Sequence, residues 1–216
     1  METTEQQPLT TMIRDVTKRM FRHLTALGIP IIEGNSSLAQ LEYLASLAQR
    51  LDARVVGEIG FLTGFSSIAL LLSSPTLTVV SFDEGRHSCV KPAKEFIDEH
   101  FPGRHRLILG DSRETVPAYA ADADNPRLDL VYIDGGHEYD EVTADVANCR
   151  SACAPGAAAI IDDLTPWRPW GEGPTRAWEN AVRTGVLEPI EILSDGVPVP
   201  EIEGPADRIW ALGRYA

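Results

Sequence analysis

Two apolar stretches, residues 128–133 and 157–161, run directly into titratable side chains. These side chains are Asp134, His137, Asp162 and Asp163. The carboxyl ends of buried strands are where an open α/β sheet binds its ligands, so acids and a histidine placed there predict a functional site. Carboxylates bind cations, and an imidazole accepts a proton near neutral pH.

Each of these residues also has a purely structural interpretation. Asp134 can begin an Asp-Gly turn, and Asp162 with Asp163 can cap a helix. His137 can lie beside a helix N-cap without a chemical role. We favour the functional interpretation because four such residues follow two separate apolar stretches.

A glycine-rich turn occurs earlier, in VVGEIGFLTGFSS at residues 55–67, between an apolar stretch and helix-like sequence. Its pattern is E-x-G-x-x-x-G, formed by Glu58, Gly60 and Gly64, with Ser66 following. A dinucleotide site requires G-x-G-x-x-G, and a phosphate-binding P-loop requires Gly-Lys-Ser/Thr. The two glycines allow a ligand close to the backbone, and Glu58 suits a cationic group such as the amine or sulfonium of S-adenosylmethionine. Such a turn can equally serve tight packing.

Further acids follow the next two apolar stretches. Asp83 ends TVVSFD, about 20 residues after the turn, where an acid can accept both ribose hydroxyls of a nucleoside. Asp111 and Ser112 follow the third stretch and are candidates for the adenine edge, although either residue can also be a helix N-cap. The predicted cofactor site therefore consists of the glycine turn and the acids and serines near it: Glu58, Gly60, Gly64, Ser66, Asp83, Asp111, Ser112 and Asp134.

Charge and composition limit the class of partner. The chain has 216 residues, with 32 acidic against 19 basic side chains and a net charge of −13. This charge repels nucleic acid and anionic membranes, and no run of Lys or Arg offsets it. The N-terminal sequence is polar, and no apolar run approaches the ~20 residues needed to span a bilayer. We expect a cytoplasmic protein with no nucleic-acid or membrane partner.

The three cysteines have no disulfide or zinc pattern, and we expect free thiols. They are Cys89, Cys149 and Cys153.

Apolar stretches alternate with helix-period segments from residue 54 onward, which predicts a parallel sheet with helices on both faces. Strands are expected at 54–60, 77–83, 105–111, 128–135 and 157–164, followed by an antiparallel terminal pair at 188–194 and 208–215. Helices are expected at 66–73, 88–100, 113–121, 138–152 and 174–184. The fold class is therefore α/β, with seven strands. Asp140 and Asp145 are expected on a solvated helix face.

Two further helices, at 10–27 and 37–51, precede the sheet and form a predicted N-terminal helical cap or a simple cover for one sheet face. We expect a single domain over 1–216, with an N-terminal helical extension at 1–36 and a core at 37–216. The terminal strands are joined by a Pro- and Gly-rich segment that predicts an irregular turn. Trp167 and Trp170 lie in a loop that is either a lid or ordinary packing, whereas Trp178 and Trp210 are expected in the core.

The order EIGFLTGFS, Asp83, YIDGGH and IIDDL resembles the class I S-adenosylmethionine-dependent methyltransferases, over about residues 37–215. More narrowly, it is similar to the cation-dependent O-methyltransferases, which include catechol, caffeoyl-CoA and macrolide-sugar enzymes, the last from antibiotic biosynthesis. The resemblance implies a seven-stranded Rossmann-like methyltransferase sheet, S-adenosylmethionine as methyl donor, and a divalent cation, Mg²⁺ or Mn²⁺. It also implies a homodimer.

Carried over by position, the resemblance makes Asp134, Asp162 and Asp163 the metal ligands. Catechol-type enzymes have Asn in place of Asp163 and Lys in place of His137, so this sequence is closer to the macrolide-sugar enzymes, in which that histidine is the proposed general base. Physical reasoning agrees, because three carboxylates at one sheet edge repel each other without a cation, and all-oxygen ligation suits Mg²⁺.

The expected reaction is methyl transfer to a hydroxyl of a small molecule, a sugar or a natural-product scaffold, with His137 accepting the proton. Two alternatives stay open. One is a metal-independent N- or C-methyltransferase, and the other is a cofactor-binding module without catalytic activity.

Overall fold

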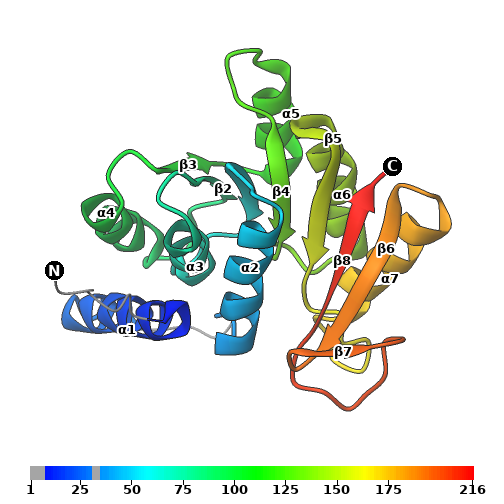
Figure 1. Cartoon of the computed structure of the whole chain (residues 1–216), viewed down its shortest axis with the longest axis horizontal. Helices are drawn as coiled ribbons and strands as arrows, with labels where there is room; N and C mark the ends of the chain where they lie inside the picture. Colours follow the sequence, from blue (N-terminus) through cyan, green and yellow to red (C-terminus); the bar gives the residue numbers. More distant parts are fainter. Residues whose placement is uncertain (1–7, 31–34) are drawn as a thin grey trace, which may run out of the picture.

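The computed structural model describes residues 8–30 and 35–216 (Figure 1). Parts of the predicted extension, residues 1–7 and 31–34, lie outside the described residues. The elements in chain order are α1 (Leu9–Ala26), α2 (Leu38–Arg50), β1 (Val55–Ile59), α3 (Phe65–Ser73), β2 (Thr78–Asp83), α4 (Val90–His100), β3 (His105–Leu109), α5 (Ser112–Ala121), β4 (Leu128–Ile133), α6 (Tyr139–Ala152), β5 (Cys153–Ile161), α7 (Glu172–Arg183), β6 (Leu187–Ser194), β7 (Val197–Val199) and β8 (Ile209–Tyr215).

The strands form one mixed sheet of eight strands in the order β3-β2-β1-β4-β5-β8-β6-β7. The first five strands of that order are parallel, as predicted. Strand β8 runs antiparallel to both β5 and β6, so the terminal antiparallel pair is also present. The α/β class of the sequence prediction is confirmed, whereas the number of strands is not.

The eighth strand, β7, lies within the segment expected to be an irregular turn, so the prediction of seven strands was wrong. It pairs with β6 through a two-residue hairpin in which Ser194 faces Val197. Asp195 and Gly196 have φ values of 49° and 88°, as the Asp-Gly hairpin turn requires. The prolines of this segment obscured the hairpin, but Pro198 is tolerated because β7 is an edge strand.

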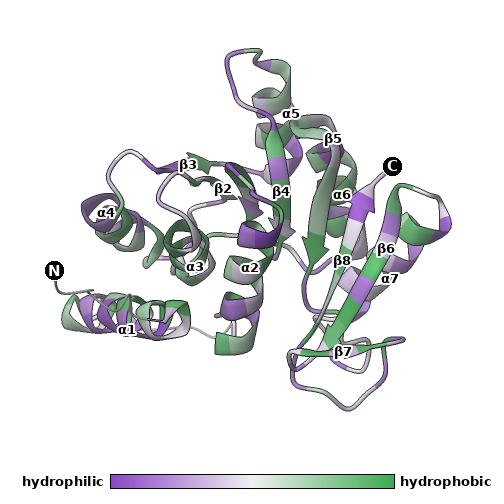
Figure 2. Cartoon of the chain, viewed as in Figure 1, coloured by the Kyte–Doolittle hydropathy of each residue, from purple (hydrophilic) through white to green (hydrophobic). Residues whose placement is uncertain are grey.

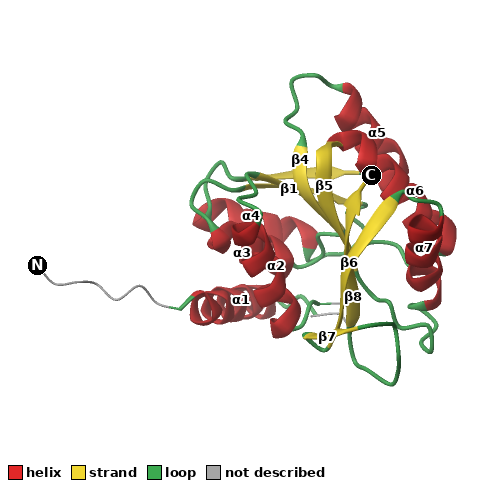
Figure 3. Cartoon of the chain, turned by 45° about the vertical axis from the view of Figure 1, so that its right-hand side comes forward, coloured by secondary structure: helices red, strands yellow, loops and turns green. Residues whose placement is uncertain are grey.

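Helices cover both faces of the sheet, with α1–α4 on one side and α5–α7 on the other (Figure 3). Alternate residues of β4 serve the two layers: Leu130 and Tyr132 pack in the core with α1–α4, and Val131 and Ile133 in the core with α5–α7. A strand buried on both faces reads as a continuous apolar stretch, which is why the parallel strands were visible in the sequence. Figure 2 shows α3 mostly hydrophobic, whereas α1 mixes hydrophobic and hydrophilic residues.

The two N-terminal helices belong to the first layer. Helix α1 packs against α2, α3 and α4, and α2 packs against α3. Helix α2 begins with a capping box, in which the Ser37 side chain accepts from the Gln40 N–H and the Gln40 side chain accepts from the Ser37 N–H. The N-terminal end of α2 also borders the large cavity through Ser37 and Ala39. No helix within residues 8–30 and 35–216 is long and apolar enough to cross a bilayer.

The ends of β1, β2 and β4 meet at Gly60. The N–H of Gly60 donates to the carbonyl of Phe82 at 2.9 Å. The carbonyl of Ile59, the residue before it, accepts from the N–H of Asp134 at 2.9 Å. A Cβ at Gly60 would lie 2.1 Å from the carbonyl oxygen of Asp134, and φ is 91°. Only glycine fits this position, which holds the turn after β1 against the start of the loop after β4.

We predict that Gly60→Ala destabilises the protein far more than Gly103→Ala. Both residues have positive φ, but a Cβ at Gly103 has no atom within 4 Å. The Gly103 variant should lose about 1 to 2 kcal/mol of unfolding free energy from backbone strain alone. The Gly60 variant should lose about 2 to 5 kcal/mol because overpacking adds to the strain. Urea denaturation of the two variants checks this, and equal losses would contradict the close approach at Gly60.

Candidate active site

One large cavity of about 1900 Å³ runs along the carboxyl edge of the parallel strands. Every parallel strand contributes to its wall at or just after its last residue, and β8 contributes the residue before its first. These residues are Gly60 after β1, Asp83 at the end of β2, Gly110 after β3, Asp134 after β4, Asp163 after β5 and Arg208 before β8. The cavity therefore lies where an open α/β sheet binds its ligands.

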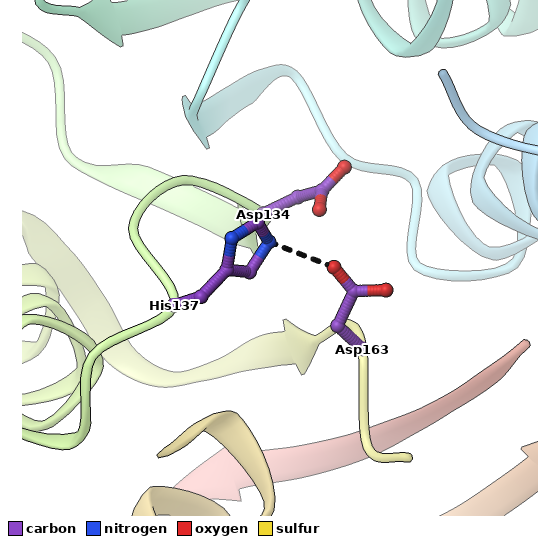
Figure 4. A group of neighbouring side chains, drawn as sticks. All are labelled: Asp134, His137 and Asp163. Atoms are coloured by element: carbon purple, nitrogen blue, oxygen red, sulfur yellow. Dashed lines mark hydrogen bonds and ion pairs between the residues drawn. The ribbon is translucent and has the colours of Figure 1, made fainter. Parts of the chain in front are cut away.

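Asp134, His137 and Asp163 form a cluster in this cavity (Figure 4). Each offers one ligand atom, and these atoms all lie within 4.8 Å of one another. His137 Nε2 lies 2.9 Å from Asp163 Oδ2, and the carboxylate of Asp134 points toward the same space. Asp163 has a φ of 59°, a left-handed conformation that is costly for a non-glycine residue. Strain of this kind is tolerated where function requires a particular side-chain direction.

Asp162 lies beside this cluster but is turned away from it. Its Oδ1 accepts from the N–H of Asp163 at 2.7 Å, and its Oδ2 accepts from Gln40 Nε2 at 2.5 Å. The hydroxyl of Tyr132 contacts Asp162 and also lies 2.9 Å from Asp134 Oδ2. The structure thus brings all three predicted metal acids together, with Asp134 and Asp163 facing His137 and Asp162 behind them. Metal binding by Asp162 stays a prediction.

The three carboxylates carry more negative charge than their surroundings neutralise. Burial raises the pKa of Asp134 well above its usual range, and the charges of Asp162 and Asp163 raise it further. Burial, followed by the charge of Asp163, raises the pKa of Asp162 to about 7. The Tyr132 hydroxyl has a single proton and can donate to only one of its two acids. Arg208 Nη1 is 3.5 Å from Asp163 Oδ1, which compensates this acid in part.

The donor set fits a hard divalent cation. Two facing carboxylates supply oxygen ligands beside the imidazole of His137, and their negative charge favours a positive ion between them. The hydrogen bond to Asp163 raises the pKa of His137, against the opposing effect of burial. The pair orients the imidazole in the cavity wall, where 46% of its side chain is exposed.

The predicted cofactor residues separate into two groups. Asp83, Asp111 and Ser112 line the cavity together with Gly60 and Asp134. Asp83 also holds the glycine turn: its Oδ2 accepts from the N–H groups of Phe61 at 2.9 Å and Leu62 at 3.1 Å.

Asp111 is the N-cap of α5, which was the alternative to a role at the adenine edge. Its Oδ1 accepts from the N–H of Arg113 at 2.9 Å, and its Oδ2 pairs with the Arg113 guanidinium at 2.6 Å.

Glu58, Gly64 and Ser66 lie outside the cavity lining. Glu58 is fully buried behind the turn, where its Oε2 accepts from Ser67 Oγ at 2.6 Å and Ser81 Oγ at 2.5 Å. Gly64 has a φ of 71°, and a Cβ there would lie 2.6 Å from Ile97. These residues support the shape of the turn from behind, and direct contact with a cofactor stays a prediction.

Several residues of the site had no clear sequence signal. Tyr132 and Gln40 hold the acids, but their sequence context gives no indication of this. Tyr132 lies in the apolar strand β4, and Gln40 lies in the amphipathic helix α2. Asp145 was expected on a solvated face, and this was wrong: it is 1% exposed and lines the cavity. The missed signal was its helical spacing, because Asp145 lies between Val142 and Cys149 on the buried face of α6, a helix that packs against α5.

The tryptophan loop borders the same cavity. Trp170 and Arg168 line the wall, and the Arg168 guanidinium lies 5.4 Å from the centre of the Trp170 ring. Trp167 instead packs on Gly204. A lid function stays a prediction. Trp178 and Trp210 are buried in the core, as predicted.

We predict that Glu58→Gln removes part of the pH dependence of stability. Burial raises the pKa of Glu58 to about 7 from its ordinary 4.5. Folding therefore favours the protonated acid, and its contribution, present below pH 4.5, is lost as pH rises through 7. The loss amounts to about 3 kcal/mol. Unfolding free energies from urea titrations at pH 5 to 8 should fall more steeply for the wild type than for the variant, and parallel curves would contradict the assignment.

Comparisons with known proteins identify a methyltransferase domain. The family model of the methyltransferase domain matches residues 58–164, which include every site residue that the sequence predicted. The sequence has no significant match among curated proteins.

Solved structures show the same fold. The O-methyltransferase TomG from Streptomyces achromogenes, in complex with S-adenosylmethionine, has 18% identity, a TM-score of 0.72, and coverage of 93% of this chain and 89% of its own. The O-methyltransferase from Bacillus cereus, in complex with S-adenosylhomocysteine, has 18% identity, a TM-score of 0.71, and coverage of 98% and 93%. A putative caffeoyl-CoA O-methyltransferase from Staphylococcus aureus has 13% identity, a TM-score of 0.66, and coverage of 95% and 98%.

The expected resemblance is confirmed: residues 58–164 match a methyltransferase domain, and the chain has the fold of the solved O-methyltransferases.

Proposed function

We propose that this protein is a divalent-cation-dependent O-methyltransferase that acts on a hydroxyl of a small molecule, a sugar or a natural-product scaffold. One observation carries the proposal: Asp134, His137 and Asp163 face each other within 4.8 Å at the strand ends. This places acids suited to a cation beside a base suited to a hydroxyl proton. A methyl acceptor on nitrogen or carbon has no need of such an acidic cluster.

Asp134 and Asp163 would hold the cation, Mg²⁺ or Mn²⁺. Both present carboxylate oxygens to the same space, and burial together with the charges of Asp162 and Asp163 raises the pKa of Asp134, which Arg208 offsets only in part. Asp162, which Gln40 and Tyr132 hold in place, adds a further negative charge behind the pair. When bound, the cation would make the acceptor hydroxyl more acidic, and S-adenosylmethionine would supply the methyl group.

His137 would accept the proton from the acceptor hydroxyl. Its Nε2 lies 2.9 Å from Asp163 Oδ2, so the tautomer that donates from Nε2 leaves Nδ1 with the free lone pair. Asp163 thereby fixes the ring orientation and favours the imidazolium formed when the proton arrives. The half-exposed ring is accessible to an acceptor in the cavity.

The acceptor would lie beyond Asp163, between the loop after β5 and the segment before β8. The wall there combines the indole of Trp170 with charged side chains of Arg168, Asp195, Asp207 and Arg208. An indole face and several polar groups suit a hydroxylated ring, which presents both C–H and O–H groups. A volume of about 1900 Å³ is ample for a nucleoside donor together with such an acceptor. The similarity to TomG, which is involved in tomaymycin synthesis, supports a natural-product acceptor.

The remaining parts of the proposal concern assembly and location. We propose a cytoplasmic homodimer, for which the exposed apolar side chains of Phe21 and Leu27 at α1 offer contact surface. The net charge of −13 argues against a nucleic-acid acceptor.

Metal dependence is the direct test. We expect enzyme treated with a chelator to lose at least about a hundredfold in turnover, and Mg²⁺ or Mn²⁺ to restore it. Asp163→Asn should abolish Mn²⁺ binding in calorimetry while the protein still binds S-adenosylhomocysteine. Asp140→Asn, an exposed acid on α6, is the matched control and should bind Mn²⁺ as the wild type does. Full turnover after chelation would overturn the proposal in favour of a metal-independent methyltransferase.

The role of His137 has its own test. His137→Ala should lower kcat by about 10² to 10⁴ with a small change in KM, because the proton acceptor is lost while binding contacts remain. His137→Gln can still donate a hydrogen bond to Asp163 but cannot accept the proton, so it should be equally slow. Steady-state kinetics decide: a fast Gln variant beside a slow Ala variant would show that His137 only positions Asp163.

A further inference from the structure

Asp145 is a buried acid in the cavity wall with an unsatisfied oxygen. It lies on α6, is 1% exposed, and lines the cavity. Within the part of the chain that the structure describes, its Oδ1 has no hydrogen-bond partner. An unpaired buried acceptor costs about 1 to 3 kcal/mol, and more when it is charged, so a ligand in the cavity that donates a hydrogen bond to Asp145 would remove this cost.

The surroundings of Asp145 leave its charge available. Burial raises its pKa to about 6, and a hydrogen bond with Ser112 lowers it. At neutral pH the group is therefore mainly a carboxylate. Asp111 differs, because both of its oxygens are engaged by Arg113 through contacts of 2.6 to 3.0 Å. Compared with Asp111, Asp145 therefore has the free acceptor.

The position of Asp145 in the fold indicates which part of a ligand it meets. The acidic cluster lies after β4 and β5, whereas Asp145 hydrogen-bonds with Ser112, the first residue of α5, after β3. Strands β1 and β2 lie between β3 and β4 in the sheet. In an S-adenosylmethionine molecule the reactive sulfonium must lie near the cluster, so the ribose extends past Asp83 at the end of β2 and the base reaches the end of β3.

We propose that Asp145 reads the adenine base of the methyl donor by accepting a hydrogen bond from its exocyclic amine. A carboxylate has only acceptors, and the exocyclic amine is the donor that adenine presents at its edge. The same oxygen rejects a base with a carbonyl at that position, because two acceptors would then face each other in a dry site. This inference rests on the proposed function, since it takes the bound nucleoside to be the adenosyl donor.

The test compares two ligands on the full chain. One is S-adenosylhomocysteine, and the other is S-inosylhomocysteine, in which a carbonyl replaces the exocyclic amine. Calorimetry should show that the wild type prefers the adenosyl ligand by at least tenfold, since sites that hydrogen-bond a substrate N–H reject analogues lacking it strongly. Asp145→Asn can donate to that carbonyl, so its preference should fall by at least tenfold relative to the wild type. The near-isosteric change should keep the melting temperature.

Two further variants separate the alternatives. Asp140→Asn, on the exposed side of the same helix, should show the wild-type preference. If Asp111→Asn loses the preference and Asp145→Asn retains it, Asp111 reads the base and the inference is overturned. Equal affinity of the wild type for the two ligands also overturns it. A wild type that binds neither ligand contradicts the proposed donor itself, which distinguishes that failure from an error about Asp145 alone.

Discussion

Repulsion between carboxylates at the ends of β4 and β5 is the constraint on which the site depends. Parallel strands bring their carboxyl ends to one edge, so the residues after them, Asp134, Asp162 and Asp163, are forced together. Burial and the charges of the neighbouring acids raise the pKa values of Asp134 and Asp162, and Arg208 offsets these effects only in part. Like charges held at this distance require a compensating cation or a bound proton. This arrangement is the basis of the proposed cation site.

The two helical layers contribute different parts of that site. From the α1–α4 side, Gln40 and the Tyr132 hydroxyl hold Asp162, and the capping box of α2 fixes Gln40 in turn. From the other side, the loop into α6 supplies His137 to Asp163. Because the acids are held from both faces, the reactive groups are positioned before any ligand binds. Such preorganisation is the main means by which an enzyme holds oxygen, methyl and sulfur in line.

Acids that look alike in the sequence have different roles in and behind the cavity wall. Asp83 holds the glycine turn with one oxygen, Asp111 caps α5, and Glu58 is buried behind the turn with two serine partners. Only contacts distinguish these roles from ligand binding. Asp145 shows the opposite case, in which an acid that resembles a surface residue is buried and retains an unpaired oxygen.

By itself, the sequence determined the α/β class, the five parallel strands and the acids that end them, because strands buried on both faces are apolar throughout and a charge at their end is conspicuous. The order of motifs also determined the methyltransferase family. Tertiary structure alone decided which oxygens face the cavity, since Asp162 turns to Gln40, 122 residues away in sequence, while Asp163 turns to His137. It also decided the burial of Asp145 and of Glu58. The direction of a side chain depends on partners from distant elements, and these partners cannot be predicted from the local periodicity of the sequence.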